Sequence, residues 1–90
     1  MEDWGYRVAY QEFEPGRTSV IARAGGSDTK APLCLTGHLD VVPAWREDWS
    51  IEPFALLEKE GWFYGRGTTD DKHMVAAFLA TLIRLRREGY

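Results

Sequence analysis

Two short polar segments, one after an apolar run and one before a helical pattern, constrain the fold of this chain most. Residues 37–43 (GHLDVVP) follow the apolar run at residues 33–36, and residues 65–72 (GRGTTDDK) precede an amphipathic stretch. A histidine and an aspartate therefore lie where a strand is expected to end and where a helix is expected to begin. Side chains at such ends of rigid elements can converge on a metal ion.

The surrounding patterns predict an α/β chain, with part of a mixed β-sheet and a long flanking C-terminal helix. Residues 33–36 (LCLT) lack polar alternation, which is typical of a central strand buried on both faces. Alternation at residues 6–11 and β-branched residues within 18–24 predict a hairpin around a Pro-Gly turn. Residues 55–59 and 62–64 predict a second hairpin around Glu60-Gly61.

Residues 71–88 predict the helix. Thr69, Asp70 or Asp71 can cap its start, and Gly89 fits the position just past its end. At 100° per residue the apolar side chains share one broad face. These are Met74, Val75, Ala76, Phe78, Leu79, Leu82, Ile83 and Leu85. His73 falls on the opposite face, so we expect it to be exposed to solvent.

The composition argues against several partners. A net charge of −3 gives no support for nucleic-acid binding, and the arginines at 84, 86 and 87 are where cations complement a helix dipole. No apolar run approaches the ~18 residues of a membrane span, so no membrane partner is expected. The N-terminus lacks an apolar signal segment, which predicts a cytoplasmic location. Cys34 is the lone cysteine, expected as a small buried hydrophobe.

The segment at residues 44–54 is irregular and aromatic. Trp45 and Trp49 could line a substrate cleft, or they could hold a long loop against the core. We favour the second interpretation, because large aromatic side chains bury much apolar area.

His38 and Asp40 are spaced so that both side chains point to the same side of an extended backbone. A carboxylate that accepts from one imidazole nitrogen fixes the tautomer and leaves the other nitrogen for a metal. The same pair could form an acid–base dyad for a nucleophile, although none of the three serines lies in a nucleophile-elbow motif. A histidine that is simply hydrogen-bonded in a turn is the plainest alternative.

Asp70 follows a glycine-rich turn. Its simplest role is a helix N-cap, but a cap alone needs no preceding Gly-Arg-Gly. A carboxylate has two oxygens and can bridge two ions that lie ~3.5–4 Å apart in two-metal hydrolytic sites.

The two segments, with Trp49 and Pro53-Phe54 between them, resemble the N-terminal signatures of the M20 metallopeptidases. That family includes carboxypeptidases, aminoacylases, dipeptidases and deacylases. The resemblance covers roughly residues 20–90. It implies that residues 1–90 are the N-terminal portion of a metallopeptidase catalytic domain, truncated at both ends.

The resemblance also implies roles. His38 would be a zinc ligand, Asp40 its partner in catalysis, and Asp70 the carboxylate bridging two zinc ions, with cobalt or manganese as alternatives. The Asp70–Asp71 bond would be cis. The reaction would be amide hydrolysis of a peptide or N-acyl amino acid. His73 departs from the glycine usual in the family, and Asp71 from a position that is often apolar.

The catalytic Glu and the remaining ligands of the family lie beyond the helix. We therefore expect the isolated chain to be inactive and to bind metal weakly. Exposed strand edges and apolar faces predict self-association. A non-catalytic globular remnant or interaction module is the alternative reading, and a His/Asp-assisted serine hydrolase is a third.

Overall fold

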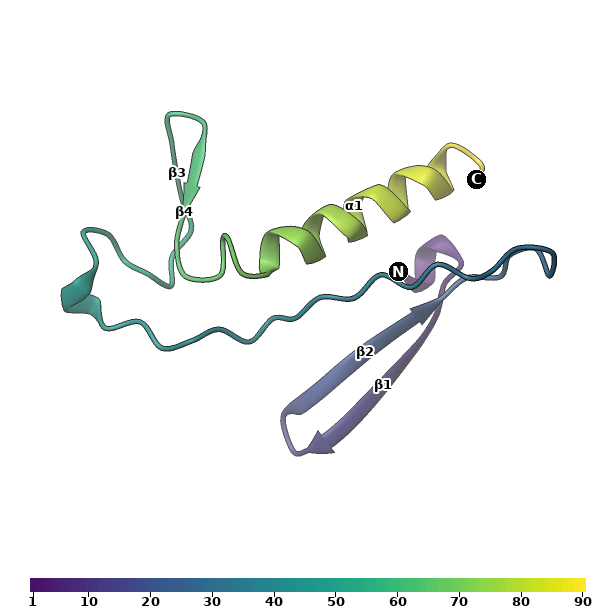
Figure 1. Cartoon of the computed structure of the whole chain (residues 1–90), viewed down its shortest axis with the longest axis horizontal. Coiled ribbons are helices and arrows are strands. Elements are labelled where there is room, and N and C mark those ends of the chain that lie inside the picture. Colours follow the sequence, from purple (N-terminus) through teal and green to yellow (C-terminus); the bar gives the residue numbers. More distant parts are fainter. The chain divides into compact units, whose positions relative to one another are not determined.

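A computed structural model describes residues 1–90, the whole chain. It contains two antiparallel hairpins, one α-helix and two short 3-10 helices (Figure 1). The chain divides into two compact units, which we describe separately. The first comprises residues 1–34 and 83–90, and the second comprises residues 35–82.

In the first unit, strands β1 (Arg7–Glu14) and β2 (Arg17–Arg23) pair antiparallel across the predicted turn. Gly16 occupies that turn with φ of 80°, a conformation that glycine adopts without steric cost. Val8 lies opposite Ala22, and a bulge interrupts the register near the turn. The alternation that predicted this hairpin is therefore confirmed as strand structure.

The first unit also contains the end of helix α1 (Lys72–Arg87) and the 3-10 helix η1 (Glu2–Trp4). Gly89 has φ of 89° and closes the helix with two reverse hydrogen bonds, from Gly89 N to the Arg86 carbonyl and from Tyr90 N to the Leu85 carbonyl. This is a Schellman ending, as the glycine after the helical pattern predicted. Arg86 stacks over the Tyr6 ring, with 5.2 Å from its Cζ to the ring centroid.

The second unit contains η2 (Arg46–Asp48) and the hairpin of β3 (Leu57–Lys59) and β4 (Trp62–Tyr64). The tip of this hairpin is formed by Glu60 and Gly61, both with positive φ. The hairpin leads directly into the glycine-rich turn that precedes α1. Helix α1 begins after Asp71, whose carbonyl accepts the first helical hydrogen bonds from Met74 and Val75.

The α/β class is confirmed, but the strand predicted at residues 33–36 is absent. These residues form no ladder, Leu33 is 83% exposed, and Cys34 is exposed rather than buried. The β-structure therefore consists of the two separate hairpins. A strand exists only where a neighbouring strand accepts its hydrogen bonds, and no other segment of this chain pairs with residues 33–36.

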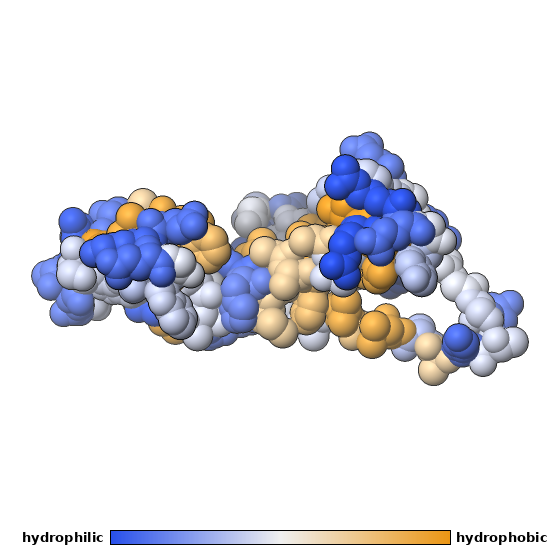
Figure 2. Space-filling model, turned by 90° about the horizontal axis from the view of Figure 1, so that it is seen from above, coloured by the Kyte–Doolittle hydropathy of each residue, from blue (hydrophilic) through white to orange (hydrophobic).

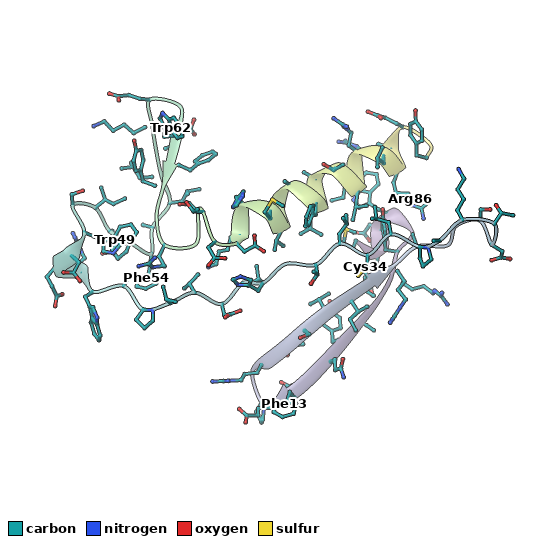
Figure 3. All side chains as sticks on the ribbon, viewed as in Figure 1. Phe13, Cys34, Trp49, Phe54, Trp62 and Arg86 are labelled. Atoms are coloured by element: carbon teal, nitrogen blue, oxygen red, sulfur yellow. The ribbon has the colours of Figure 1, made fainter.

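Apolar side chains cover much of the surface (Figure 2). Tyr6 is the only large hydrophobic residue classed as buried, and Pro53 is enclosed completely. Phe13, at the tip of the first hairpin, is 90% exposed, and Trp62 in the second is 70% exposed (Figure 3). No helix is long and apolar enough to cross a membrane.

Candidate metal centre

The two motif segments run side by side in opposite directions within the second unit. Residues near the start of segment 37–43 face the helix start, and residues near its end face the glycine turn. The facing pairs are Gly37 with Val75, His38 with Asp70, Val41 with Gly67, and Pro43 with Arg66. The His38–Asp70 pair is therefore flanked by contacts on both sides.

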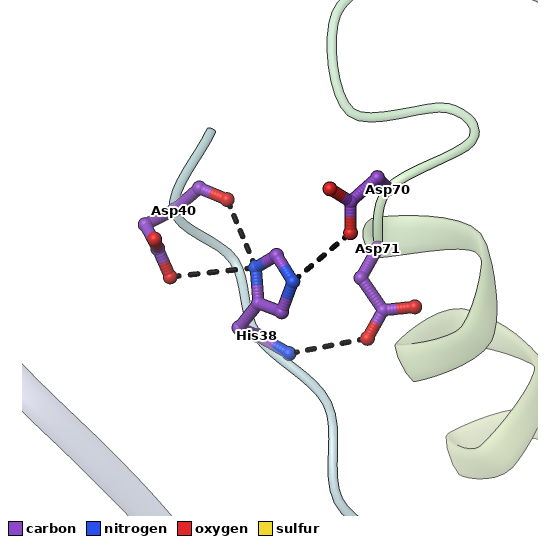
Figure 4. A network of polar contacts seen from close by, with 4 residues as sticks. All are labelled: His38, Asp40, Asp70 and Asp71. Atoms are coloured by element: carbon purple, nitrogen blue, oxygen red, sulfur yellow. Dashed lines mark hydrogen bonds and ion pairs between the residues drawn. The ribbon is translucent and has the colours of Figure 1, made fainter. Parts of the chain in front are cut away.

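His38 is the centre of the polar contacts (Figure 4). Its Nε2 lies 3.1 Å from Asp70 Oδ1. Its Nδ1 lies 3.0 Å from the backbone carbonyl oxygen of Asp40 and 3.4 Å from the Asp40 carboxylate. The backbone N–H of His38 donates to Asp71 Oδ2 at 3.4 Å. One imidazole thus joins both motif segments.

Acceptors at both ring nitrogens favour the doubly protonated imidazolium, because each nitrogen then donates a hydrogen bond. The pKa of His38 is accordingly raised above its usual value. The hydrogen bond to the Asp40 backbone carbonyl is the largest cause of the raised pKa. Desolvation opposes it, and the negative charges of Asp40 and Asp70 and the hydrogen bond to Asp70 add smaller increases. All of these side chains are accessible to water, so the shift is a local electrostatic effect.

The geometry of this pair suits a shared cation. Two ligands of a tetrahedral zinc ion, each at ~2.0–2.2 Å from it, lie about 3.4 Å apart. The observed separation of 3.1 Å between His38 Nε2 and Asp70 Oδ1 is close to that value. Imidazole nitrogen and carboxylate oxygen are both common zinc donors. The chain gathers no group of three or more His, Cys, Asp or Glu side chains around one point.

The structure brings together the residues that the sequence singled out. His38 meets Asp40 on one side and Asp70 on the other, and the Asp70–Asp71 peptide bond is cis. His73 is exposed, as its position on the helical wheel predicted. These contacts leave the functional roles of His38, Asp40 and Asp70 as predictions.

Three contacts at the site, made by Asp71 and Arg66, were not predicted. Asp71, expected only as a possible helix cap, accepts from the backbone N–H of His38. Arg66 stacks over Trp49, with 5.0 Å from Cζ to the ring centroid, and donates to the Pro43 carbonyl at 3.4 Å. Trp49 is half-buried by this contact, whereas Trp45 is exposed. An arginine between two glycines, downstream of a tryptophan-containing loop, was the only available signal for this stack.

The sequence model of the Peptidase family M20/M25/M40 matches residues 34–90, which is more than half of the chain and includes both motif segments. This chain belongs to the M20 family. No solved structure matches it significantly.

Several characterised M20 proteins are similar to this chain. It is 42% identical over 99 aligned residues to a succinyl-diaminopimelate desuccinylase of Parvibaculum lavamentivorans, covering 100% of the chain and 25% of that protein. It is 42% identical over 76 residues to the N-fatty-acyl-amino acid synthase/hydrolase PM20D1 of Xenopus tropicalis, covering 83% of the chain and 15% of that protein. It is 43% identical over 75 residues to the acetylornithine deacetylase of Vibrio campbellii, covering 83% of the chain and 19% of that protein. The M20 chain thus spans a quarter or less of these relatives.

Proposed function

We propose that this chain supplies part of the metal centre of a zinc-dependent M20 hydrolase that cleaves amide bonds. His38 and Asp70 are the proposed ligands, and Asp40 holds the His38 ring in the tautomer that leaves Nε2 available. In the complete enzyme Asp70 would bridge two zinc ions, for which cobalt or manganese could substitute. The observation that carries the proposal is the approach of His38 Nε2 to Asp70 Oδ1 from two separate motif segments.

The hydrogen bond between His38 and Asp70 supports this assignment. His38 Nε2 and Asp70 Oδ1 share a proton in this hydrogen bond. Both atoms would be donors to a divalent cation once that proton is lost. The pKa of His38 is raised first by the hydrogen bond to the Asp40 backbone carbonyl, and the negative charges of Asp40 and Asp70 add to it. The oxygen atoms around His38 thus attract positive charge, either as the proton on the imidazole or as the proposed metal ion.

The residues of this chain have distinct roles in the proposed site. Bound zinc supplies Lewis acidity for an activated water and a polarised carbonyl. His38 presents Nε2, while the Asp40 carbonyl and carboxylate restrain its ring. Asp71 holds the backbone of His38 near the start of α1. Catalytic zinc sites use three protein ligands, so two from this chain give weak binding and no turnover on their own.

N-acyl amino acids are the proposed substrate class, with peptides as the alternative. The names of the three relatives describe a desuccinylase of diaminopimelate, a hydrolase of N-fatty-acyl amino acids, and a deacetylase of acetylornithine. Each of these names describes a compound in which an acyl group is attached to an amino acid. The common chemistry is an amide bond between the two.

The proposal is tested by titrating the chain with zinc and following both histidines by NMR. We expect zinc to shift the ring signals of His38 with a dissociation constant in the micromolar range or weaker. Asp70→Asn should abolish this response. His38→Ala has no ring signal at residue 38, so its zinc binding is measured by calorimetric titration and should be lost. His73→Ala is the matched control, because His73 is the other histidine of the chain and is exposed.

Zinc binding that persists in both His38→Ala and Asp70→Asn would refute the ligand assignment. Sub-micromolar binding that vanishes in His38→Ala would instead show a more complete site than the two ligands described. Hydrolysis of an N-acyl amino acid by the chain alone would refute the expected inactivity.

A further inference from the structure

Gly37 lies directly before His38 and faces the first turn of α1. A Cβ atom placed on Gly37 would lie 2.6 Å from Val75 Cγ2 and 3.0 Å from Asp71 Oδ2. Such a short contact between carbon atoms requires one of the two backbones to move, because valine has few rotamers on a helix. The absence of a side chain at Gly37 therefore determines how closely the His38 segment approaches the helix.

Gly67 has the corresponding position on the other side of the His38–Asp70 pair. It is buried, its φ is 89°, and a Cβ there would lie 3.0 Å from Val41 Cγ1 and 3.1 Å from Lys72 Cδ. A side chain at this position would be strained by the backbone conformation and would also crowd Val41. A side chain at Gly67 would therefore strain the turn and push Val41 and Lys72 outward by a few tenths of an ångström.

Both glycines therefore flank the proposed ligand pair. A Cβ atom added at Gly37 would meet Val75, and one added at Gly67 would meet Val41. The pair between them is separated by 3.1 Å, although His38 and Asp70 come from segments 32 residues apart. A displacement of either segment by about 1 Å would carry the two donors beyond the distance that one zinc ion can span.

We propose that Gly37 and Gly67 are positioning residues that set the distance between His38 and Asp70, with Val75 and Val41 as their opposing surfaces. The proposal rests on the assignment of these two residues as metal ligands. Neither glycine would touch the metal or the substrate.

The decisive experiment is a second-site rescue. Gly37→Ala should weaken zinc binding at His38 about tenfold or more, the order of loss seen when residues that orient metal ligands are changed. In the double variant Gly37→Ala with Val75→Ala, the Cγ2 atom responsible for the 2.6 Å contact is removed. Binding should then recover most of the lost affinity. The double variant is compared with Val75→Ala alone, which accounts for any loss caused by shortening Val75 itself.

Matched glycines elsewhere in the chain control for the substitution itself. Gly25 has no atom within 4 Å of an added Cβ, so Gly25→Ala should leave zinc binding unchanged. Gly61 has φ of 81° and also has open space around it, so Gly61→Ala carries the backbone cost without the crowding. Gly67→Ala should therefore weaken zinc binding far more than Gly61→Ala.

A second measurement separates this proposal from the proposed function. In the metal-free chain, nuclear Overhauser effects between the His38 ring and the Asp70 methylene report their proximity directly. They should weaken in Gly37→Ala and return in the double variant. If the unaltered chain shows no zinc response, the ligand assignment fails and these metal-free signals still test the spacing.

Two results would overturn the spacing role. One is a Gly37→Ala variant whose Overhauser effects and zinc affinity match those of the unaltered chain. The other is a double variant as impaired as Gly37→Ala, since the contact with Val75 would then not be the cause.

Discussion

At the scale of single residues, His38 is the side chain on which the proposed metal site depends. Its two ring nitrogens face oxygen atoms of Asp40 and Asp70, from different segments. In the metal-free chain these oxygens stabilise a proton, and in the proposed metal-bound chain they restrain the ring and share the cation. Proton and metal are therefore competitors for one nitrogen atom.

This competition gives a pH prediction. The pKa of His38 is raised in the folded chain, so the protonated ring stabilises the fold. That stabilisation is fully present below the ordinary histidine pKa of about 6.5 and is lost as the pH rises through the folded value. Zinc affinity should change in the opposite sense and increase over the same pH interval. An NMR titration of the chain without zinc measures the pKa of His38, and the same titration with zinc measures how the affinity changes with pH. A His38 midpoint below about 6.5 would contradict the raised pKa.

Two charge-removing variants should separate the causes of the raised pKa. Asp40→Asn removes a negative charge but keeps the backbone carbonyl, which is the largest cause. The pKa of His38 should therefore fall but stay above its ordinary value. Asp70→Asn should also lower this pKa, and it should in addition remove the zinc response. A large zinc response retained in Asp70→Asn would argue against Asp70 as a ligand.

At the scale of elements, local sequence patterns predicted both hairpins and the helix correctly. The strand predicted at residues 33–36 was wrong. The hairpins and helix α1 form hydrogen bonds among neighbouring residues, and their turn glycines are visible in the sequence. The apolar run at residues 33–36 would need a partner strand from elsewhere. The apolar pattern of residues 33–36 indicates a segment suited to burial, but no other segment of this chain covers these residues.

The site was predictable for a related reason. His38 and Asp40 are two residues apart, so the approach of the Asp40 carboxylate to His38 Nδ1 follows from an extended backbone. The shorter contact of the same nitrogen with the Asp40 backbone carbonyl was not predicted. The approach of Asp70 could be expected only from the family resemblance, because it lies 32 residues away. The hydrogen bond from His38 N to Asp71 and the close contact of Gly37 with Val75 could not be predicted, since both depend on how the segment lies against α1.

The stack of Arg66 on Trp49 gives a prediction for the loop. Arg66→Met removes the cation–π contact and the donor to the Pro43 carbonyl, which should cost about 1 kcal/mol of local stability. The amide of Lys72, bonded to the Gly67 carbonyl, should then exchange its hydrogen about fivefold faster. Arg17→Met is the control, because that guanidinium makes an exposed ion pair with Glu14. Equal exchange rates in both variants would show that the stack contributes nothing.

At the scale of the whole molecule, the apolar surface is the dominant property. Large hydrophobic side chains from both hairpins and from residues 33–42 are exposed, whereas Tyr6, which precedes the first hairpin, is buried. Exposed apolar surface and an unpaired extended segment favour association with other chains. The chain also spans only 15–25% of the three relatives described, which are correspondingly longer.

We therefore expect the purified chain to self-associate. Sedimentation velocity over a range of concentrations should show species larger than the 10.3 kDa monomer, increasing with concentration. Leu33→Lys together with Phe13→Lys should shift the distribution toward the monomer, because both side chains are exposed and apolar. A monodisperse monomer that unfolds cooperatively would contradict this expectation.

The His38–Asp70 pair also has a topological consequence. It closes a loop of 32 residues that contains η2 and the second hairpin. An ion held by both side chains would act as a reversible cross-link of this loop and reduce the conformational freedom of the unfolded chain. Chain-entropy estimates for a covalent bond around a loop of this size give about 3–4 kcal/mol. In this chain, metal binding would thus contribute to folding as well as to chemistry, and removal of the metal would loosen the loop that presents the ligands.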